Sequence, residues 1–285
     1  VIIDKQNGVV EIGWRTVSRA TAVLGDEIKW FAQDDTGETA ARFNAFYAVT
    51  DSGRLLRSTD SGDTWTNFSG GYGIGDGLAV WKDFVIVAYN NALSAYGPLS
   101  QAPIWSTAFV SLYYNGDPNN VTLFYNPISK GQDDILYVGD GNLVDSLQEV
   151  SGQNFNAGTA ATYTWGTASL DLPESYKIKN IVELGENLLI GTWKGTTPEV
   201  PQARVADIFQ WNRTAGSFFL PIRQESNGVH WQITIGNITY FMAGNEGDIH
   251  ATNGSSVKFI KRIPKHITNL EGEKKIISSP AGVMH

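Results

Sequence analysis

The sequence feature that most constrains the fold is a repeat, in which a turn residue followed by a short apolar strand recurs five times. The turn residues are Asn44, Asp83, Asp134, Asn187 and Asn237, which lie 39, 51, 53 and 50 residues apart. A period near 50 residues is typical of β-propeller blades, which are four-stranded sheets that stack to bury both apolar faces. The repeat therefore predicts an all-β propeller. A β-sandwich with coincidental spacing is the alternative.

A second landmark has the same period. An aromatic residue follows four of the turn residues by 21 or 22 positions: Trp65, Trp105, Phe155 and Phe259. In the fourth copy we expect Phe218 at this place, delayed by an insertion at 196–202 that we interpret as a surface loop. Turn sequences such as Asp51-Ser52-Gly53 divide each copy into about four strands, which predicts four-stranded antiparallel blades.

The end of the chain interrupts the repeat. The next turn residue would fall near position 287, beyond His285, after the strand-like segments 275–277 and 281–283. We interpret residues 1–285 as one propeller domain of about six blades, with five and seven as the alternatives. N-terminal strands such as Val9–Ile12 would complete the last blade and remove an open sheet edge.

Composition excludes several classes of function. The net charge is -8 and there is no basic run, so the chain is not expected to bind nucleic acid. No apolar run approaches the roughly 20 residues that span a bilayer, so no membrane insertion is expected. The absence of cysteine rules out disulfides and thiolate metal sites. The four histidines lack the spacing of metal ligands, and we predict no metal site and no cofactor: His230, His250, His266 and His285.

One motif has readable local chemistry. Residues 58–65 fit the pattern Ser-x-Asp-x-Gly-x-Thr-Trp, where Asp60 can accept amide protons of a turn, Gly62 permits a positive φ and Trp65 anchors the hairpin. The motif resembles the Asp-box, or bacterial neuraminidase repeat. The resemblance implies that Ser58, Asp60, Gly62 and Trp65 form a structural corner between the third and fourth strands of a blade, away from catalysis. Residues 252–255 are similar to a degenerate copy of the same box.

A wider resemblance concerns segments 184–192 and 206–211, which are similar to propellers that accompany phage tails and virions. This resemblance implies a virion or extracellular location.

The Asp-box family includes sialidases, which carry an arginine triad and an Arg-Ile-Pro motif before their boxes. Here Arg262-Ile263-Pro264 follows the box, and the arginines show no triad at the blade period. The other candidates have a structural interpretation. We interpret the glycine-rich segment 70–77 as a loop between blades, and the adjacent acidic residues at 34–35 and 133–134 as turn residues. The tryptophans are expected to fill the space between sheets: Trp14, Trp30, Trp81, Trp193, Trp211 and Trp231. No catalytic residue is predicted.

These observations predict a non-enzymatic structural or attachment propeller of a virion or phage tail. Its expected partners are proteins of an assembly or surface glycans. A sialidase-like glycoside hydrolase is the first alternative, and a secreted bacterial carbohydrate-binding propeller is the second.

Overall fold

The computed structural model describes about three fifths of the chain and includes strands from every copy of the repeat. The described residues are 2–4, 9–11, 28–34, 45–50, 52–60, 64–69, 77–81, 84–89, 92–96, 99, 110–113, 128–130, 135–149, 163–197, 200–201, 206–215, 217–224, 228–243 and 248–262. Within these ranges the regular structure is entirely β, without a helix. The described part therefore also has no helix of the length and apolarity that a membrane span requires.

Five antiparallel sheets follow one another along the described parts of the chain. The first contains β3 (Ile28–Gln33), β4 (Phe46–Thr50), β5 (Leu55–Ser58) and β6 (Thr66–Ser69). The second contains β7 (Gly77–Trp81), β8 (Phe84–Tyr89), β9 (Ala92–Tyr96) and β10 (Val110–Tyr113). The third contains β11 (Ile128–Lys130), β12 (Leu136–Asp140), β13 (Leu143–Glu149) and β14 (Tyr163–Asp171).

The last two sheets repeat this order. The fourth contains β15 (Tyr176–Leu184), β16 (Asn187–Thr197), β18 (Ala206–Trp211) and β19 (Phe219–Gln224), with the short β17 (Val200–Pro201) beside β16. The fifth contains β20 (Val229–Ile235), β21 (Ile238–Ala243), β22 (Asp248–Thr252) and β23 (Val257–Arg262). In each sheet, strands adjacent in sequence are neighbours in space.

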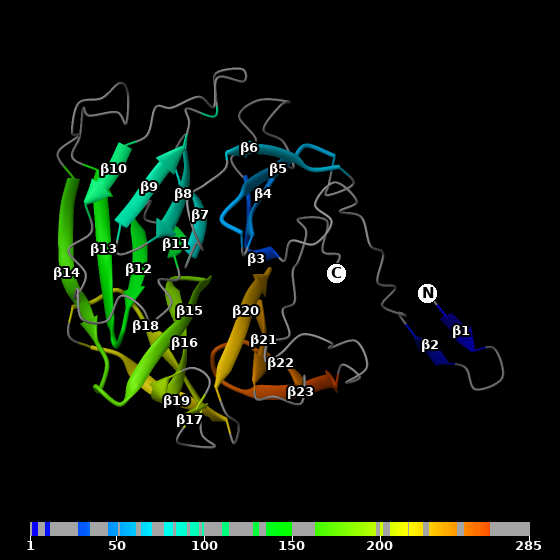
Figure 1. Cartoon of the computed structure of the whole chain (residues 1–285). Coiled ribbons are helices and arrows are strands. Elements are labelled where there is room, and N and C mark those ends of the chain that lie inside the picture. The colour runs from blue at the N-terminus through cyan, green and yellow to red at the C-terminus, as the bar shows by residue number, and fades with distance from the viewer. Residues whose placement is uncertain are drawn as a thin grey trace.

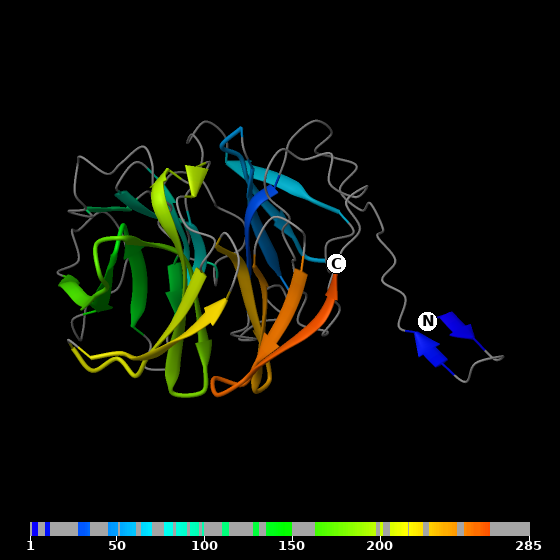
Figure 2. The same ribbon diagram turned by 90° about the horizontal axis from the view of Figure 1, so that it is seen from below.

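The repeated apolar strand of the sequence is the second strand of every sheet. The five repeat copies correspond to β4, β8, β12, β16 and β21. The first strand of each sheet contacts the first strand of the next, from β3 through β7, β11 and β15 to β20. Figures 1 and 2 show the sheets arranged in this order around a common centre. The prediction of an all-β propeller with four-stranded antiparallel blades is confirmed.

The repeated strands are continuous apolar runs because both of their faces are buried. In β4, Tyr47 and Val49 belong to a cluster that joins the first sheet to the second. Phe46 and Ala48 point the opposite way, into a cluster with Leu56 and Trp65. Successive side chains of a strand face opposite sides of the sheet, so a blade packed on both sides needs apolar residues at every position.

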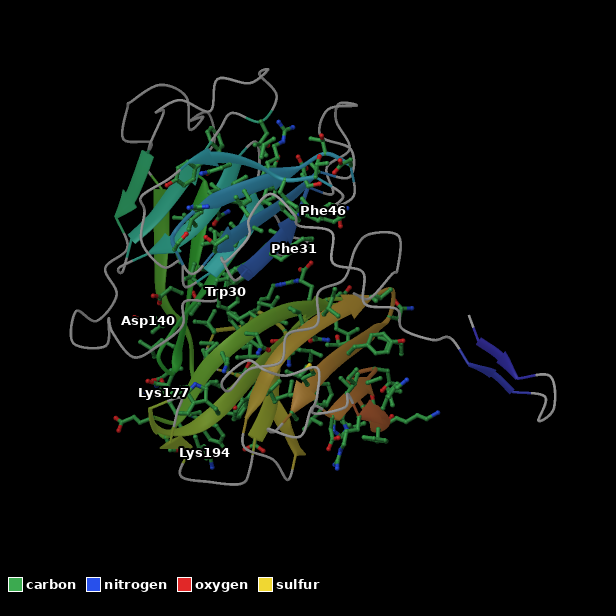
Figure 3. All side chains as sticks on the ribbon, turned by 45° about the vertical axis from the view of Figure 1, so that its right-hand side comes forward. Trp30, Phe31, Phe46, Asp140, Lys177 and Lys194 are labelled. Atoms are coloured by element: carbon green, nitrogen blue, oxygen red, sulfur yellow. The ribbon has the colours of Figure 1, made fainter. Side chains whose placement is uncertain are left out.

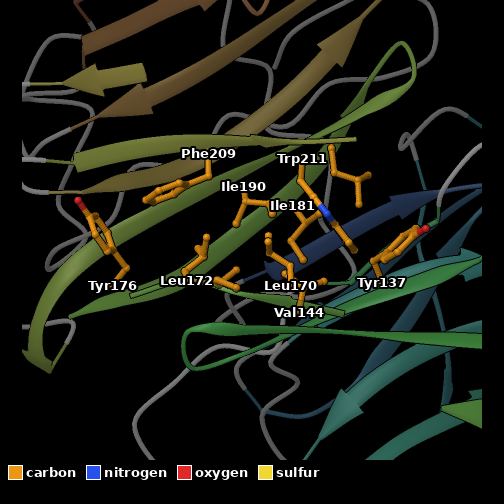
Figure 4. Close-up of a cluster of buried hydrophobic side chains, with 11 residues drawn as sticks. Tyr137, Val144, Leu170, Leu172, Tyr176, Ile181, Ile190, Phe209 and Trp211 are labelled. Atoms are coloured by element: carbon orange, nitrogen blue, oxygen red, sulfur yellow. The ribbon is translucent and has the colours of Figure 1, made fainter. Parts of the chain in front are cut away.

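Larger apolar clusters hold the later blades together. Eleven buried residues of the third and fourth sheets form one cluster, which extends from Tyr176 and Phe209 to Tyr137 and Trp211 (Figure 4). Another cluster joins the fourth sheet to the fifth, through Leu189 on one side and Phe241 on the other. Packing between neighbouring sheets therefore makes these larger parts of the core.

The insertion that we interpreted as a surface loop forms regular structure in part. Strand β16 continues into it as far as Thr197, and β17 pairs back onto β16 through Thr197 opposite Val200 and Gly195 opposite Pro201. The insertion is thus a hairpin that extends the second strand of the fourth sheet.

The described N-terminal strands pair with each other. Strand β1 (Ile2–Asp4) pairs with β2 (Val9–Glu11) in a hairpin that lies apart from the five sheets (Figures 1 and 2). Among the described residues, β2 pairs with no strand of a blade. The strand-like segments 275–277 and 281–283 lie outside the described residues, so a sixth blade and a single domain over 1–285 stay predictions.

Candidate functional site

The segment that resembles an Asp-box connects β5 and β6, the third and fourth strands of the first sheet. The Asp60 carboxylate accepts hydrogen bonds from the Ser58 hydroxyl at 2.8 Å, the Thr64 amide at 2.8 Å and the Thr64 hydroxyl at 2.5 Å. The Thr64 hydroxyl and amide, followed by Ser58, hold the pKa of Asp60 below its ordinary value of 3.8. The carboxylate is therefore occupied in closing the turn.

Trp65 covers the apolar side of this corner. Its side chain is 8% exposed and belongs to the cluster with Phe46 and Leu56. The Phe31 ring packs edge-on against it at 6.1 Å and lies 5.1 Å from Phe46, and Figure 3 labels these two phenylalanines next to each other on the first sheet. The structure brings Ser58, Asp60 and Trp65 together, while Gly62 lies outside the described residues.

A corresponding corner joins β22 to β23, at residues 252–257. The Asn253 side-chain oxygen accepts from the amides of Ser255 at 3.0 Å and Ser256 at 3.1 Å. The Thr252 hydroxyl accepts from the Gly254 amide at 3.0 Å and donates to the Ser256 carbonyl at 2.7 Å. Gly254 has a φ of 91°, which favours glycine. Residues 252–257 thus make the same kind of turn as the first corner, with a side-chain amide in place of a carboxylate.

Strand register shows which residue replaces Trp65 in the fifth sheet. Thr66 pairs with Arg57 in the first sheet, and Val257 pairs with Thr252 in the fifth. This register places Val257, not the predicted Phe259, at the end of the corner. Phe259 lies two residues further along β23 and is 53% exposed.

A third corner, which the sequence analysis did not identify, spans Trp211–Phe218 between β18 and β19. The Asn212 side chain accepts from the Thr214 amide at 3.1 Å, and the Trp211 indole donates to the Thr214 carbonyl at 2.8 Å. Arg213 has a φ of 66° and its guanidinium forms an ion pair with Glu183. Two features of the sequence could have indicated this corner: the segment is as long as 58–65, and it ends in an aromatic residue. That residue, Phe218, packs edge-on against Phe209 at 5.2 Å.

Charged groups also meet where the third and fourth sheets join. The Tyr176 hydroxyl donates to the buried Asp207 carboxylate, and the Lys194 ammonium lies 4.1 Å from the centre of the Tyr176 ring. The Ile178 amide donates to the Gly141 carbonyl at 2.7 Å, across the two sheets. Figure 3 shows Asp140, Lys177 and Lys194 at this junction. The Ile178–Gly141 bond connects the two blades, and the Tyr176–Asp207 bond within the fourth sheet places a buried carboxylate against a tyrosine hydroxyl.

The remaining sequence candidates lie at separate places. Arg262 is on β23, where its guanidinium binds the Asp248 carboxylate through two hydrogen bonds of 2.5 and 2.8 Å. Trp81, Trp193 and Trp211 are buried, as packing residues should be. Trp14, residues 70–76, Asp35, Asp133, Asp134, His266 and His285 lie outside the described residues, as do the side chains of Trp231 and His230. The described part holds no group of three side chains that could bind a metal ion.

The outermost strand of the fifth sheet, β23, presents the clearest surface feature. Its residues from Lys258 to Arg262 are all exposed, including Phe259 at 53% and Ile260 at 42%. His250 lies between the rings of Phe241 and Phe259, stacked on the first at 5.3 Å and edge-on to the second at 5.6 Å. Burial lowers the pKa of His250 below 6.5, and the nearby Asp248 carboxylate opposes this shift.

Comparisons with known proteins identify the fold. No family model and no curated protein matches the sequence. The crystal structure of a nidogen/laminin complex is 12% identical over 84% of this chain and 81% of that chain, with a TM-score of 0.54. Virginiamycin B lyase from Staphylococcus aureus is 11% identical over 78% of this chain and 68% of its own, with a TM-score of 0.52.

YCF48 bound to the D1 peptide is similar in the same way, with 11% identity over 86% of this chain and 70% of that chain and a TM-score of 0.50. The lyase and YCF48 are β-propellers. At these identities the likeness concerns the fold alone.

Proposed function

We propose that this chain is a non-enzymatic attachment propeller of a virion or phage tail that binds a partner protein. The observation that carries the proposal is β23, an exposed outer strand with two large apolar side chains, Phe259 and Ile260. Exposed apolar side chains grouped on one strand, with charged neighbours, are typical of surfaces that contact other proteins.

The surroundings of the candidate catalytic residues support binding rather than hydrolysis. Asp60 is held by Ser58 and Thr64 in a turn. Arg262 belongs to an outermost strand and is occupied by Asp248, whereas a glycosidase site needs charged groups that converge on a substrate.

The surroundings of three described tryptophans favour a protein partner over a glycan. Sugars stack on exposed aromatic faces, but Trp81, Trp193 and Trp211 are buried between the sheets. Two similar folds are recorded in complexes, one of nidogen with laminin and one of YCF48 with a peptide. These cases support protein binding as a use of this architecture. Segments 184–192 and 206–211, which resemble propellers that accompany phage tails and virions, support the virion location.

The proposal is tested by locating the chain in particles. Immunogold electron microscopy of purified particles, with an antibody against this chain, is expected to label a fixed position on the particle surface. An antibody against the capsid is the positive control. Label confined to the particle-free supernatant would contradict the virion role, and so would a coding region with no tail or capsid genes beside it.

A further inference from the structure

Strand β23 is much more exposed than the second strands β4 and β12. In β4 and β12 every residue is buried, whereas in β23 only Val257 is partly buried and the next five residues are exposed. Large apolar side chains on a solvated strand are unfavourable for the free protein, since they leave apolar area in water. Their presence on β23 therefore indicates a surface that another molecule covers.

The charge of this strand is opposite to that of the chain. Three of its six residues are basic, Lys258, Lys261 and Arg262, while the chain as a whole has a net charge of -8. Arg262 forms an ion pair with Asp248, so Lys258 and Lys261 carry the excess positive charge of β23. A basic strip on an acidic protein favours an acidic partner locally, because charge complementarity steers and orients association.

The strand register separates the two kinds of side chain. Phe259 pairs with His250 and Lys258 with Ala251, while Lys261 pairs with Ile249, so Ile260 is an extra residue in a β-bulge. Residues that pair across strands point to the same side of the sheet. Lys258 and Lys261 therefore share one face and Phe259 lies on the other, where the His250 ring supports it.

Among the described strands, β23 is also the last of its sheet, so its outer edge presents backbone groups. Lysines and a bulge on an edge disfavour pairing with a second copy of the same strand, because two basic edges repel each other. The same lysines attract a segment that carries carboxylates. The edge thus discriminates against self-association and favours an acidic extended chain.

We propose that β23 is the docking strand of this propeller for an extended acidic segment of a partner protein. An apolar side chain of that segment would contact Phe259 and Ile260, and its carboxylates would pair with Lys258 and Lys261. This inference rests on the proposed function as a binding module and names the chemistry of its partner.

The test uses the whole chain and a synthetic nine-residue peptide that alternates glutamate and valine, labelled for fluorescence anisotropy. We expect saturable binding, and an affinity about tenfold lower for Lys258→Gln/Lys261→Gln, because two exposed ion pairs contribute about 1.4 kcal/mol together. Phe259→Ser is expected to weaken binding by a similar factor. Circular dichroism confirms that each variant is folded.

The matched control is Gln148→Glu/Ala215→Glu, which changes the net charge by the same amount at exposed positions on β13 and in the corner between β18 and β19. It is expected to bind the peptide as the parent chain does. The proposal is overturned if this control loses as much affinity as the lysine variant or if a lysine–valine peptide binds equally well. A lack of saturable binding up to about 1 mM would also overturn it. Failure of the peptide to bind would not change the immunogold labelling of particles. The docking-strand proposal and the virion proposal can therefore fail independently.

Discussion

At the scale of single residues, Trp65 shows how one aromatic side chain fixes a blade corner. Its ring is 8% exposed and packs on Phe31 beside Phe46. Truncation would leave a cavity that the surrounding strands cannot fill. We expect Trp65→Ala to lower the free energy of unfolding by about 3 to 5 kcal/mol, measured by urea denaturation.

Phe259→Ala is the matched control, because Phe259 is an aromatic residue of a fourth strand that is 53% exposed. Its loss should be about 1 kcal/mol or less. Similar losses for the two variants would show that Trp65 is not a core residue.

Asp60 gives the corner a dependence on pH. Because its pKa in the folded chain lies below the ordinary 3.8, the folded state binds the proton less tightly than the unfolded state. The stabilisation is complete above pH 3.8 and is lost as the pH falls through the folded-state pKa. We expect Asp60→Ala to lower the melting temperature at pH 7 and to approach the parent chain in strong acid. A difference that stays constant with pH would exclude the carboxylate as its source.

His250 gives a second dependence on pH, in a higher range. Burial between Phe241 and Phe259 lowers its pKa below 6.5, so the unfolded chain binds a proton before the folded chain does. Its contribution favours the fold at neutral pH and decreases as the pH falls below 6.5. Thermal melts between pH 7 and pH 5 should show a weaker pH dependence in His250→Gln. An unchanged slope would contradict this assignment.

At the scale of elements, close contact between neighbouring blades depends on Gly191 in β16. A Cβ atom there would overlap the Asn180 side-chain oxygen and lie 2.8 Å from Cγ1 of Val229, in the first strand of the next sheet. The Asn180 amide group donates to the Val229 carbonyl at 2.9 Å across this junction. We expect Gly191→Ala to destabilise the chain by about 1 to 3 kcal/mol, because overpacking separates the two sheets.

Gly185→Asn is a suitable control for this measurement. Gly185 has a φ of 58° in the turn between β15 and β16, and no atom lies within 4 Å of the Cβ position. Asparagine tolerates this conformation, so the change should cost a few tenths of a kcal/mol. Equal losses at both positions would mean that the contact between sheets is not the cause.

The elements also show what the sequence could predict. The second strands were visible because burial of both faces makes continuous apolar runs, as in Phe46 to Val49. The corner at Trp211–Phe218 was hidden because its hydrogen bonds use Asn212 and backbone groups instead of the Asp-box residues. Phe259 was assigned to the wrong place because the shorter turn at 252–257 brings Val257 into register two residues earlier.

At the scale of the whole molecule, the repeat determines the architecture because each four-stranded sheet buries its faces only against its neighbours. Contacts between consecutive first strands, from β3 to β20, give the order of the blades. The pairing of β1 with β2 was not predictable, since a strand as short as Val9–Glu11 suits a blade and a separate hairpin equally. The docking strand was hidden as well, because exposure depends on which strand is outermost.

The central claim is that this propeller binds without turning over a substrate, and the most direct test is turnover itself. The purified chain and Arg262→Ala are assayed against a panel of sialosides and aryl glycosides. We expect no release above the buffer rate for either protein, because Asp60 is held in a turn and Arg262 is bonded to Asp248 on an outer strand. Substantial cleavage by the parent chain that Arg262→Ala abolishes would contradict the claim and support the sialidase alternative.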